Sequence, residues 1–368
     1  MDRIKVGVIG IGFIGAAHVE ALKRVPGVDV VAIVESCDAA GKAEALDVPN
    51  YFEDYHEMLE ACKPDCIHIC TPNSTHKEIS LYAFERGIHV LCEKPMARNT
   101  QEAREMLEAA EKSGVIHAIN FHNRFYPVPH QLRNMVNDGE LGQIYSVHGG
   151  YLQDCFLYDT DFNWRMISQN SGKTRVVADI GSHWIDLAEY VTGQGVTEVF
   201  AEFQNIYPRR KQKSADGCKE IEVDTEDSAY IMLRFENGAV GNAVITQMIA
   251  GKKNQTTILV SGSEMSAEWD SERISDLHLG YRNEANRVLT KDPALMRSET
   301  APIASYPGGH VEGFPDAFKQ NFIAIYGAIR GVKPSNPYAT FADGLHQMEI
   351  CDKLFESANT GAWIKLGI

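Results

Sequence analysis

The feature that most constrains this chain is a glycine-rich turn between a predicted strand and a predicted helix. Residues 4–10 form an apolar strand, Gly10, Gly12 and Gly15 give the pattern G-x-G-x-x-G, and residues 14–24 have helical spacing. The first glycine permits a tight turn, the second lets the backbone approach a pyrophosphate, and the third lets helix and strand pack closely. The helix start adds free N–H groups for phosphates. This context predicts a dinucleotide site; a glycine turn that binds no nucleotide is the alternative.

Strand and helix patterns alternate through about the first 120 residues. Further strands are expected at 28–34, 66–70, 89–92 and 115–121, with helices between them. Parallel strands need crossover connections, so repeated strand–helix units indicate a parallel sheet with helices on both faces. We therefore expect an α/β fold whose residues 1–124 form a doubly wound Rossmann domain that binds a dinucleotide.

The pattern changes after about residue 125, where strands follow one another closely. They are expected at 143–153, 197–207, 228–235, 239–248 and 256–261. Asn237-Gly238 is a strong hairpin signal between two of them, because both turn positions need positive φ. The polar segments 209–222 and 282–307 are expected to be loops, and helices are expected at 314–330 and 341–357. Residues 125–368 thus predict an α+β domain with a mostly antiparallel open sheet, for substrate binding and oligomerisation.

Charge and hydropathy narrow the possible partners. The chain has 35 Lys and Arg against 50 Asp and Glu, a net charge of −15. That charge opposes binding to nucleic acid or an anionic membrane, and no apolar run approaches the ~18 residues that a membrane helix requires. Residues 1–5 lead straight into a strand pattern where a signal peptide would need a longer apolar stretch. We expect a cytoplasmic protein with no nucleic-acid or membrane partner.

The cysteines do not indicate a metal site. Cys62, Cys66 and Cys70 are spaced four apart, but the last two lie on one predicted strand. At about 3.3 Å per residue they would be ~13 Å apart, too far to bind one ion. We expect core thiols and no metal.

Glu35 ends the second predicted strand, 20 residues after Gly15. An acidic residue there is suited to the ribose hydroxyls of the adenosine half of a dinucleotide. It would repel a 2′-phosphate, and the next residue is Ser36, not an arginine that could bind one. The sequence therefore predicts NAD in preference to NADP.

Three further motifs follow predicted strands or open a helix. Residues 71–76 (Thr-Pro-Asn-Ser-Thr-His) and Glu93-Lys94-Pro95 come at strand ends, where open α/β sheets bind ligands. The alternative for the first motif is a turn in which Ser74 or Thr75 caps the next helix, and the alternative for the second is a solvated surface ion pair. Asp179 and His183 are four apart, so both can face one side of a helical turn, where a carboxylate can hold a histidine in one tautomer. The alternative to a catalytic pair is that Asp179 is the N-cap of the helix and His183 is a buried core residue.

Taken in order, these motifs resemble one family, the glucose-fructose oxidoreductase, inositol dehydrogenase and MocA-type dehydrogenases. The resemblance covers essentially the whole chain and implies a Rossmann domain followed by an α+β domain whose open sheet often forms an oligomer contact. It implies that Lys94, Asp179 and His183 are catalytic. It implies nicotinamide-dinucleotide contacts from Gly10, Gly12, Phe13, Ile14, Gly15, Glu35, Thr71, Pro72, Asn73, His76, Glu93, Lys94, Asn120, Trp164 and Arg165.

The expected reaction is reversible oxidation of a secondary hydroxyl on a sugar or polyol by NAD. His183 suits the acid/base role, because its ordinary pKa of about 6.5 allows proton transfer near neutrality. Asp179 would orient it, and Lys94 would stabilise negative charge on the substrate oxygen or serve as the base itself. The other two hypotheses are a reductase of a non-sugar keto or imine compound and a nucleotide-sensing protein without turnover.

The second domain also carries a prediction about assembly. A sheet with helices on only one face leaves an apolar face of a size that is unusual on a monomer. We therefore expect a homodimer or homotetramer that contacts through this sheet.

Overall fold

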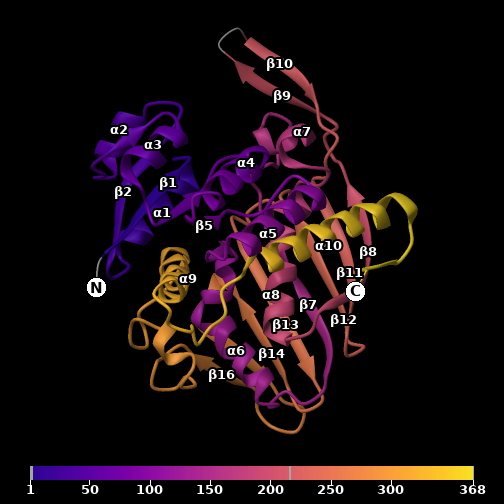
Figure 1. Ribbon diagram of the computed structural model, residues 1–368. Coiled ribbons are helices and arrows are strands. Elements are labelled where there is room, and N and C mark those ends of the chain that lie inside the picture. Colours follow the sequence, from indigo (N-terminus) through magenta and orange to yellow (C-terminus); the bar gives the residue numbers. More distant parts are fainter. Residues whose placement is uncertain (1–2, 215–216, 368) are drawn as a thin grey trace. The chain divides into compact units, whose positions relative to one another are not determined.

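The computed structural model describes residues 3–214 and 217–367, for 213 and 214 the backbone only. The chain folds into two compact units, which Figure 1 colours along the sequence. The first holds Met1–Phe125 and Gly313–His346, and the second holds Tyr126–Glu312 and Gln347–Ile368. The chain thus returns to the first unit late in the sequence, and the division after residue 124 remains a prediction.

The first unit is built on a six-stranded sheet whose neighbouring strands are all parallel, as the sequence predicted. The strand order β3-β2-β1-β4-β5-β6 reverses its direction of winding between β1 and β4. Ligands of open α/β sheets bind outside the carboxyl ends of the strands at such a reversal. The strands are β1 (Ile4–Ile9), β2 (Val28–Val34), β3 (Tyr51–Phe52), β4 (Cys66–Ile69), β5 (His89–Cys92) and β6 (His117–Ile119).

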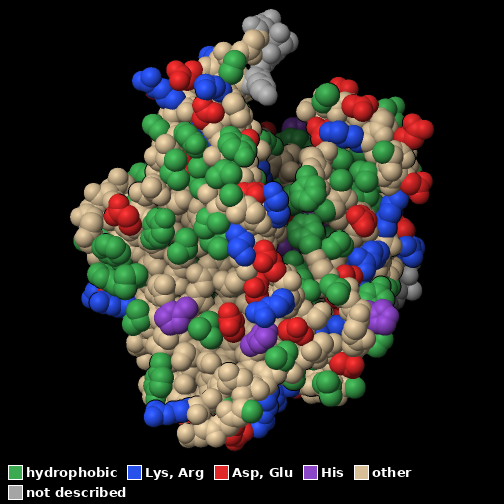
Figure 2. Space-filling model, turned by 180° about the vertical axis from the view of Figure 1, so that it is seen from behind, with side chains coloured by type: hydrophobic (Ala, Val, Ile, Leu, Met, Phe, Trp, Pro, Cys, Tyr) green, Lys and Arg blue, Asp and Glu red, His purple; other side chains and the backbone are tan. Residues whose placement is uncertain are grey.

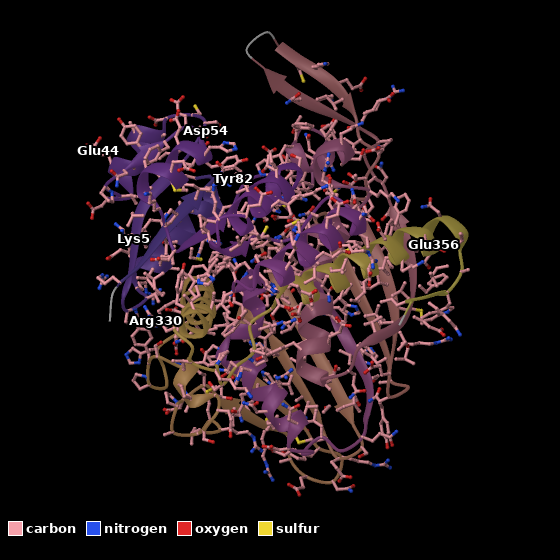
Figure 3. All side chains as sticks on the ribbon, viewed as in Figure 1. Lys5, Glu44, Asp54, Tyr82, Arg330 and Glu356 are labelled. Carbon is pink, nitrogen blue, oxygen red and sulfur yellow. The ribbon has the colours of Figure 1, made fainter. Side chains whose placement is uncertain are left out.

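Helices connect these strands, and polar side chains define where several of them begin. Asp54, labelled in Figure 3, accepts hydrogen bonds from the N–H groups of His56 and Glu57 at the start of α3. Asn99 caps α5 in the same way, and Gly114 ends that helix with a φ of +70°. The connecting helices are α1 (Phe13–Lys23), α2 (Ala39–Ala45), α3 (Tyr55–Cys62), α4 (Asn73–Phe84) and α5 (Thr100–Ser113).

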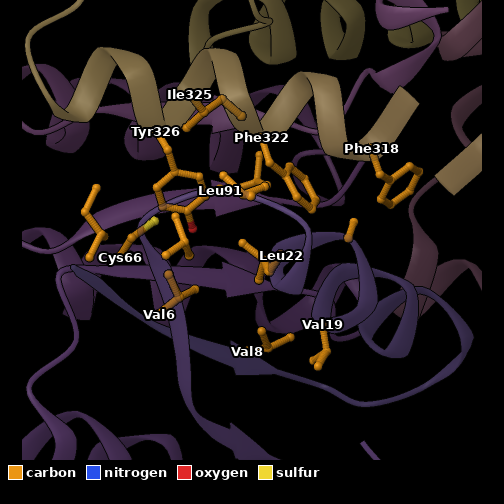
Figure 4. Close-up of a cluster of buried hydrophobic side chains, with 14 of the residues drawn as sticks. Val6, Val8, Val19, Leu22, Cys66, Leu91, Phe318, Phe322, Ile325 and Tyr326 are labelled. Carbon is orange, nitrogen blue, oxygen red and sulfur yellow. The ribbon is translucent and has the colours of Figure 1, made fainter. Parts of the chain in front are cut away.

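A helix from far along the chain, α9 (Phe314–Ile329), completes the core of the first unit. Figure 4 shows Phe318, Phe322 and Tyr326 pointing from this helix toward buried side chains of α1, β1, β4 and β5. All three aromatic side chains are almost fully buried. Burying a large side chain contributes about 1.5–3 kcal/mol, so α9 is integral to the Rossmann core.

The second unit contains a nine-stranded sheet in the order β16-β15-β14-β13-β7-β12-β11-β8-β17. Only β7 and β12 pair in parallel; every other neighbouring pair is antiparallel, so the predicted α+β class is confirmed. Gly238, with a φ of +84°, lies in the predicted hairpin turn, but Asn237 does not have the positive φ that was expected for both turn positions. The strands are β7 (Ile144–Leu152), β8 (Val196–Gln204), β11 (Ser228–Phe235), β12 (Val240–Thr246), β13 (Gln255–Gly262), β14 (Ser266–Asp270), β15 (Asp276–Gly280), β16 (Arg287–Thr290) and β17 (Ile364–Lys365).

Helices α6 (Pro127–Asn137) and α8 (Ser182–Thr192) pack on this sheet. The indole N–H of Trp184 donates to the carbonyl of Thr257 on β13 at 2.8 Å and fixes α8 to the sheet. Along β11 the side chains alternate between buried and exposed, with Tyr230 and Met232 exposed. The remaining helices are α7 (Ser168–Ser171) and α10 (Phe341–Thr360), which begins in the first unit.

Two segments expected to be loops form strands. Residues 209–222 make the hairpin β9 (Arg209–Ser214) and β10 (Gly217–Glu222), which pair antiparallel, and residues 282–307 include β16. The loop prediction was wrong because it relied on polarity. The described side chains of β10 are almost all exposed, so they carry no apolar alternation that would reveal a strand.

Among the described residues, no helix has the length and apolarity to cross a membrane. On the face that Figure 2 shows, Lys and Arg side chains lie among Asp and Glu side chains and form no continuous basic surface.

Candidate active site

The glycine turn follows β1 at the point where the strand order reverses. Gly10 has a φ of +87°, and a Cβ there would lie 2.8 Å from Thr71 Cγ2. A Cβ on Gly15 would lie 1.9 Å from the Gly10 carbonyl oxygen. A Cβ on Gly12 would meet nothing within 4 Å. The fold itself therefore requires Gly10 and Gly15, while Gly12 borders open space and leaves the backbone accessible to a phosphate, so the turn fits a dinucleotide.

Glu35 lies beside this turn at the end of β2. Its carboxylate accepts hydrogen bonds from the N–H groups of Ile11 and Ser36, both at 2.9 Å, and pairs with Lys42 Nζ at 2.8 Å. Burial raises the pKa of Glu35, but the bonds from Lys42 and Ile11 outweigh it, so the pKa lies below its ordinary value. Glu35 is thus ionised at neutral pH, and it lies at the position expected for the adenosine ribose.

The motif after β4 forms a turn and the first residues of α4. Pro72 occupies the N-cap position of α4 and the helix starts at Asn73, so capping by Ser74 or Thr75 is not what the structure shows. His76 is fully buried, and its ring nitrogens lie 2.9 Å from the Thr71 carbonyl and 3.2 Å from the Pro95 carbonyl. His76 therefore connects the segments that follow β4 and β5.

Glu93 and Lys94 follow β5 at the same edge of the sheet. Glu93 is only 7% exposed, which rules out a solvated carboxylate. It accepts hydrogen bonds from His18 Nε2 at 2.9 Å, from Asn120 Nδ2, and from the Lys94 N–H at 3.1 Å. Burial alone would raise the pKa of Glu93, but its bonds to His18 and the nearby charge of Lys94 lower it to about 2. The Lys94–Pro95 peptide is cis.

The second unit contains the other predicted catalytic residues. Asp179 lies in a π-helical turn, η3 (Val177–Gly181), that continues into α8, so it is not the N-cap of that helix. Its carboxylate accepts a hydrogen bond from Gln247 Nε2 at 3.1 Å and lies 3.5 Å from Arg165 Nε. His183 is buried on α8, with its ring centroid 6.4 Å from that of Tyr151. π-Helical turns within α-helices are frequent at functional sites.

Trp164 and Arg165 form the short helix η2 (Trp164–Met166) beside Asp179. The Arg165 guanidinium lies over the Trp164 ring, 4.5 Å from its centroid. Asn163 accepts a hydrogen bond from the Arg165 N–H at 3.1 Å and so fixes the start of the helix. The structure therefore brings this pair to Asp179, the predicted catalytic carboxylate of the same unit.

A buried ionic network holds the segment that leads into Asp179. Asp227 accepts hydrogen bonds from Arg175 and, at 2.7 Å, from Arg210, and none of the three side chains is exposed. Glu226 accepts from the N–H groups of Arg175 and Val177, each at 2.9 Å, and burial raises its pKa. Because breaking such a pair leaves an uncompensated buried charge, this network restrains residues 175–177.

Sequence reasoning missed several polar residues near Asp179. Gln247 Nε2 also donates to Gln153 Oε1 at 3.0 Å, and the Tyr151 hydroxyl donates to Asn254 Oδ1 at 2.8 Å. Burial raises the pKa of Tyr151, and the charge of Asp179 raises it further. Gln153 and Gln247 each lie one residue past the end of a strand, β7 and β12, and that position was the available signal. These amides and the hydroxyl offer the donors and acceptors that a polyhydroxy compound would need.

The predicted site residues thus form one group in each unit. No set of three His, Cys, Asp or Glu side chains that could hold a metal ion occurs in residues 3–214 and 217–367. The group at the sheet edge of the first unit combines an accessible backbone turn, a carboxylate for ribose hydroxyls and a lysine beside a buried anion. The group in the second unit combines an imidazole with a carboxylate that is held on both sides.

Comparison with known proteins identifies the family that both parts of the chain match. A family described as "Oxidoreductase family, NAD-binding Rossmann fold" matches residues 4–121, and the GFO/IDH/MocA C-terminal domain matches residues 130–268. Levoglucosan dehydrogenase of Pseudarthrobacter phenanthrenivorans is 30% identical over 395 aligned positions, covering 99% of this chain and 98% of that protein. D-glucoside 3-dehydrogenase of Escherichia coli is 33% identical over 242 positions, covering 64% of this chain and 68% of that protein.

Solved structures show the same likeness. A levoglucosan dehydrogenase in complex with NADH and L-sorbose matches with a TM-score of 0.92 at 27% identity, covering 100% of both chains. The similarity therefore extends through both units of the chain, and that relative holds a nicotinamide dinucleotide and a sugar.

Proposed function

The chain belongs to the GFO/IDH/MocA family of NAD-binding oxidoreductases, and from this premise we propose that it is an NAD-dependent dehydrogenase of a sugar or polyol. The observation that carries the proposal is the placement of Lys94 beside the buried, ionised Glu93 at the carboxyl edge of the Rossmann sheet. A nucleotide-sensing protein without turnover would be free to lose Lys94, and this chain retains it. The names of the relatives support a carbohydrate substrate.

The cofactor would be held by residues of both units. NAD, when bound, accepts a hydride from the substrate carbon. We assign its binding to Gly10, Gly12, Phe13, Ile14, Gly15, Glu35, Thr71, Pro72, Asn73, His76, Glu93, Lys94 and Asn120 in the first unit, and to Trp164 and Arg165 in the second.

The proposed chemistry removes a proton from the substrate hydroxyl as the hydride leaves. His183 takes this proton, because an imidazole is poised for proton transfer near neutral pH. Asp179, held by Arg165 and Gln247, positions His183. Lys94 donates a hydrogen bond to the substrate oxygen and stabilises the negative charge that develops there. If His183 proves dispensable, Lys94 is the proton acceptor.

Steady-state kinetics test these roles. A panel of sugars and polyols is incubated with NAD, and NADH formation is followed by absorbance. On the best substrate, Lys94→Ala should lower kcat by about 10²–10³-fold and His183→Ala by about 10²–10⁴-fold. Asp179→Asn should cost less, because it only positions His183. The matched control Lys77→Ala removes a surface lysine paired with Glu105 and should leave kcat unchanged.

Two other functions are distinguished by the same experiment. If no sugar or polyol is oxidised but NADH is consumed with keto or imine compounds, the protein is a reductase of such compounds. If NADH binds and no compound turns over, the protein senses the nucleotide. If all three catalytic variants lose NADH binding in a fluorescence titration, their role is structural.

We propose that residues 1–124 bind the cofactor and that residues 125–368 bind the substrate and form a homodimer or homotetramer. Tyr230, Met232 and Val240 on neighbouring strands β11 and β12 are 49%, 42% and 41% exposed, an unusual exposure for large apolar side chains in a sheet. Light scattering at micromolar concentration should give a multiple of the 40.9 kDa chain mass. A monomeric mass would contradict the proposed contact.

A further inference from the structure

A chain of four buried polar side chains runs through the core of the first unit and ends at Glu93. The Tyr326 hydroxyl lies 2.8 Å from His68 Nε2, His68 Nδ1 lies 2.8 Å from His18 Nδ1, and His18 Nε2 lies 2.9 Å from Glu93 Oε1. Tyr326, His68 and His18 are fully buried. The four residues come from α9, β4, α1 and the end of β5, so only the folded chain brings them together.

The chain is enclosed by aromatic and thiol side chains. The ring of Phe322 lies 5.0 Å from that of His18 and 4.8 Å from that of His68, and Phe318 lies 5.3 Å from His18. Figure 4 shows the Cys66 sulfur beside the Tyr326 ring, and the thiol interacts with the Tyr326 hydroxyl. Polar groups buried in such surroundings are costly unless each donor meets an acceptor.

Donor and acceptor rules fix the direction of each bond. An ionised carboxylate can only accept hydrogen bonds, so His18 Nε2 carries a proton and donates a hydrogen bond to Glu93. If His18 is neutral, its Nδ1 is unprotonated and must accept a hydrogen bond from a protonated His68 Nδ1. His68 Nε2 is then bare, because burial lowers the pKa of His68 well below its usual value and keeps this ring neutral. The Tyr326 hydroxyl therefore donates to His68, and every donor points toward Glu93.

The only other consistent arrangement has His18 doubly protonated, with the two bonds beyond it reversed. His68 Nε2–H would then donate to Tyr326, and the Tyr326 hydroxyl hydrogen would lose its nitrogen acceptor and have only the weakly accepting Cys66 sulfur. Both arrangements form three hydrogen bonds along the chain, but only the neutral arrangement gives every donor a nitrogen or oxygen acceptor, and it buries one charge fewer.

Other titratable groups around Glu93 are neutral. Burial raises the pKa of the Cys70 and Cys92 thiols and lowers the pKa of His122 to about 3. Asn120 Nδ2 donates to Glu93, and its own oxygen accepts from Asn321 Nδ2 at 2.9 Å, so the amide orientation is fixed as well. The Glu93 carboxylate thus faces aligned donors on a rigid support.

We propose that His18, His68 and Tyr326 are positioning residues, which as two neutral imidazoles of opposite tautomer and one hydroxyl hold the Glu93 carboxylate in place beside Lys94. The chain ends at a buried tyrosine, so it serves orientation rather than exchange of protons with solvent. Its catalytic consequence rests on the proposed function, in which Lys94 meets the substrate oxygen. The hydrogen-bonded chain itself does not depend on that function.

Nitrogen-15 NMR of the histidine-labelled protein tests the chain without any activity. Of the 13 histidines, His18 and His68 are assigned by the loss of signals in His18→Gln and His68→Gln. We expect His18 to show a protonated Nε2 with a bare Nδ1, and His68 to show a protonated Nδ1 with a bare Nε2. Tyr326→Phe should perturb the His68 signals, whereas Tyr338→Phe, a tyrosine packed against the same core, should not. A doubly protonated His18, or the same tautomer in both rings, would overturn the proposal.

Kinetics on the best substrate test the positioning role. Tyr326→Phe should lower kcat about tenfold and His18→Leu about a hundredfold, because misplacing a reacting group by 1 Å can cost that much. His18→Gln, whose amide can still donate to Glu93, should recover most of the activity. Kd for NADH should change less than threefold in variants that remain folded by circular dichroism. The positioning role would be refuted if the unmodified protein shows the expected tautomers but His18→Leu has an unchanged kcat. If the unmodified protein shows no turnover, only the proposed function is refuted.

Discussion

Replacing Glu35 with serine should move cofactor preference toward NADP, and the structure gives the reason. The Glu35 carboxylate pairs with Lys42 Nζ at 2.8 Å and stays ionised, since its pKa lies below the ordinary value. In the unmodified protein this carboxylate neutralises the nearby amine, and we expect it to repel a 2′-phosphate. Removing the carboxylate therefore has two effects, because it abolishes a like-charge repulsion and releases Lys42 to meet the phosphate.

Each effect has a magnitude that follows from charge and exposure. Two unit charges 4 Å apart near a protein surface interact with about 4 kcal/mol. The Lys42 side chain is 33% exposed, so solvent and salt reduce this, and we take about 1.4 kcal/mol for each effect. Each effect should strengthen NADPH binding roughly tenfold, and the two effects together should strengthen it roughly a hundredfold. NADH should bind about 10–100-fold more weakly, through loss of ribose hydrogen bonds to a charged group.

Fluorescence titration of NADH and NADPH measures these affinities in four proteins: unmodified, Glu35→Ser, Lys42→Ala and the double variant. In the Glu35→Ser variant, adding Lys42→Ala should weaken NADPH binding about tenfold. In the unmodified protein, Lys42→Ala should leave NADPH affinity unchanged. Adding Ser36→Arg to Glu35→Ser should strengthen NADPH binding again. NADPH binding by Glu35→Ser that is no tighter than that of the unmodified protein would refute the reasoning, as would NADPH preference in the unmodified protein.

Three further predictions address the second unit and the buried anion. Gln247→Leu removes the amide that holds Asp179, so kcat should fall about tenfold while Kd for NADH is unchanged; an equal loss in both would indicate a folding defect. Asp227→Ala leaves two buried arginines without their carboxylate and should lower the free energy of unfolding in urea by about 3–5 kcal/mol, whereas the exposed control Asp159→Ala should lower it by less than about 1 kcal/mol. Because the pKa of Glu93 is lowered, its contribution to stability is present above pH 4.5 and is lost as the pH falls toward about 2. Glu93→Gln should therefore weaken the pH dependence of unfolding in that range, followed by circular dichroism. An unchanged acid transition would argue against a stabilising role for this carboxylate.

Local sequence patterns sufficed for most elements of the fold. The alternation of strands and helices predicted the parallel sheet, and Asn237-Gly238 predicted the hairpin between β11 and β12. These succeed because turn residues and apolar periodicity act over a few neighbouring positions. Where a strand carries neither signal, as in the polar hairpin of β9 and β10, the same reasoning predicted loops.

The sequence by itself also determined that the predicted ligand-binding residues lie at one edge of the sheet, since Gly10–Gly15, Glu35 and Glu93-Lys94 all follow strands of the parallel sheet, whose carboxyl ends share that edge. It could not indicate that Tyr326, His68 and His18 form a chain to Glu93, or that Gln247 holds Asp179. Tyr326 and His68 are 258 positions apart in the sequence, and each looks like an ordinary core residue in its own segment. A buried polar side chain must find its partner wherever packing brings one, so only the tertiary structure decides which distant donors and acceptors meet.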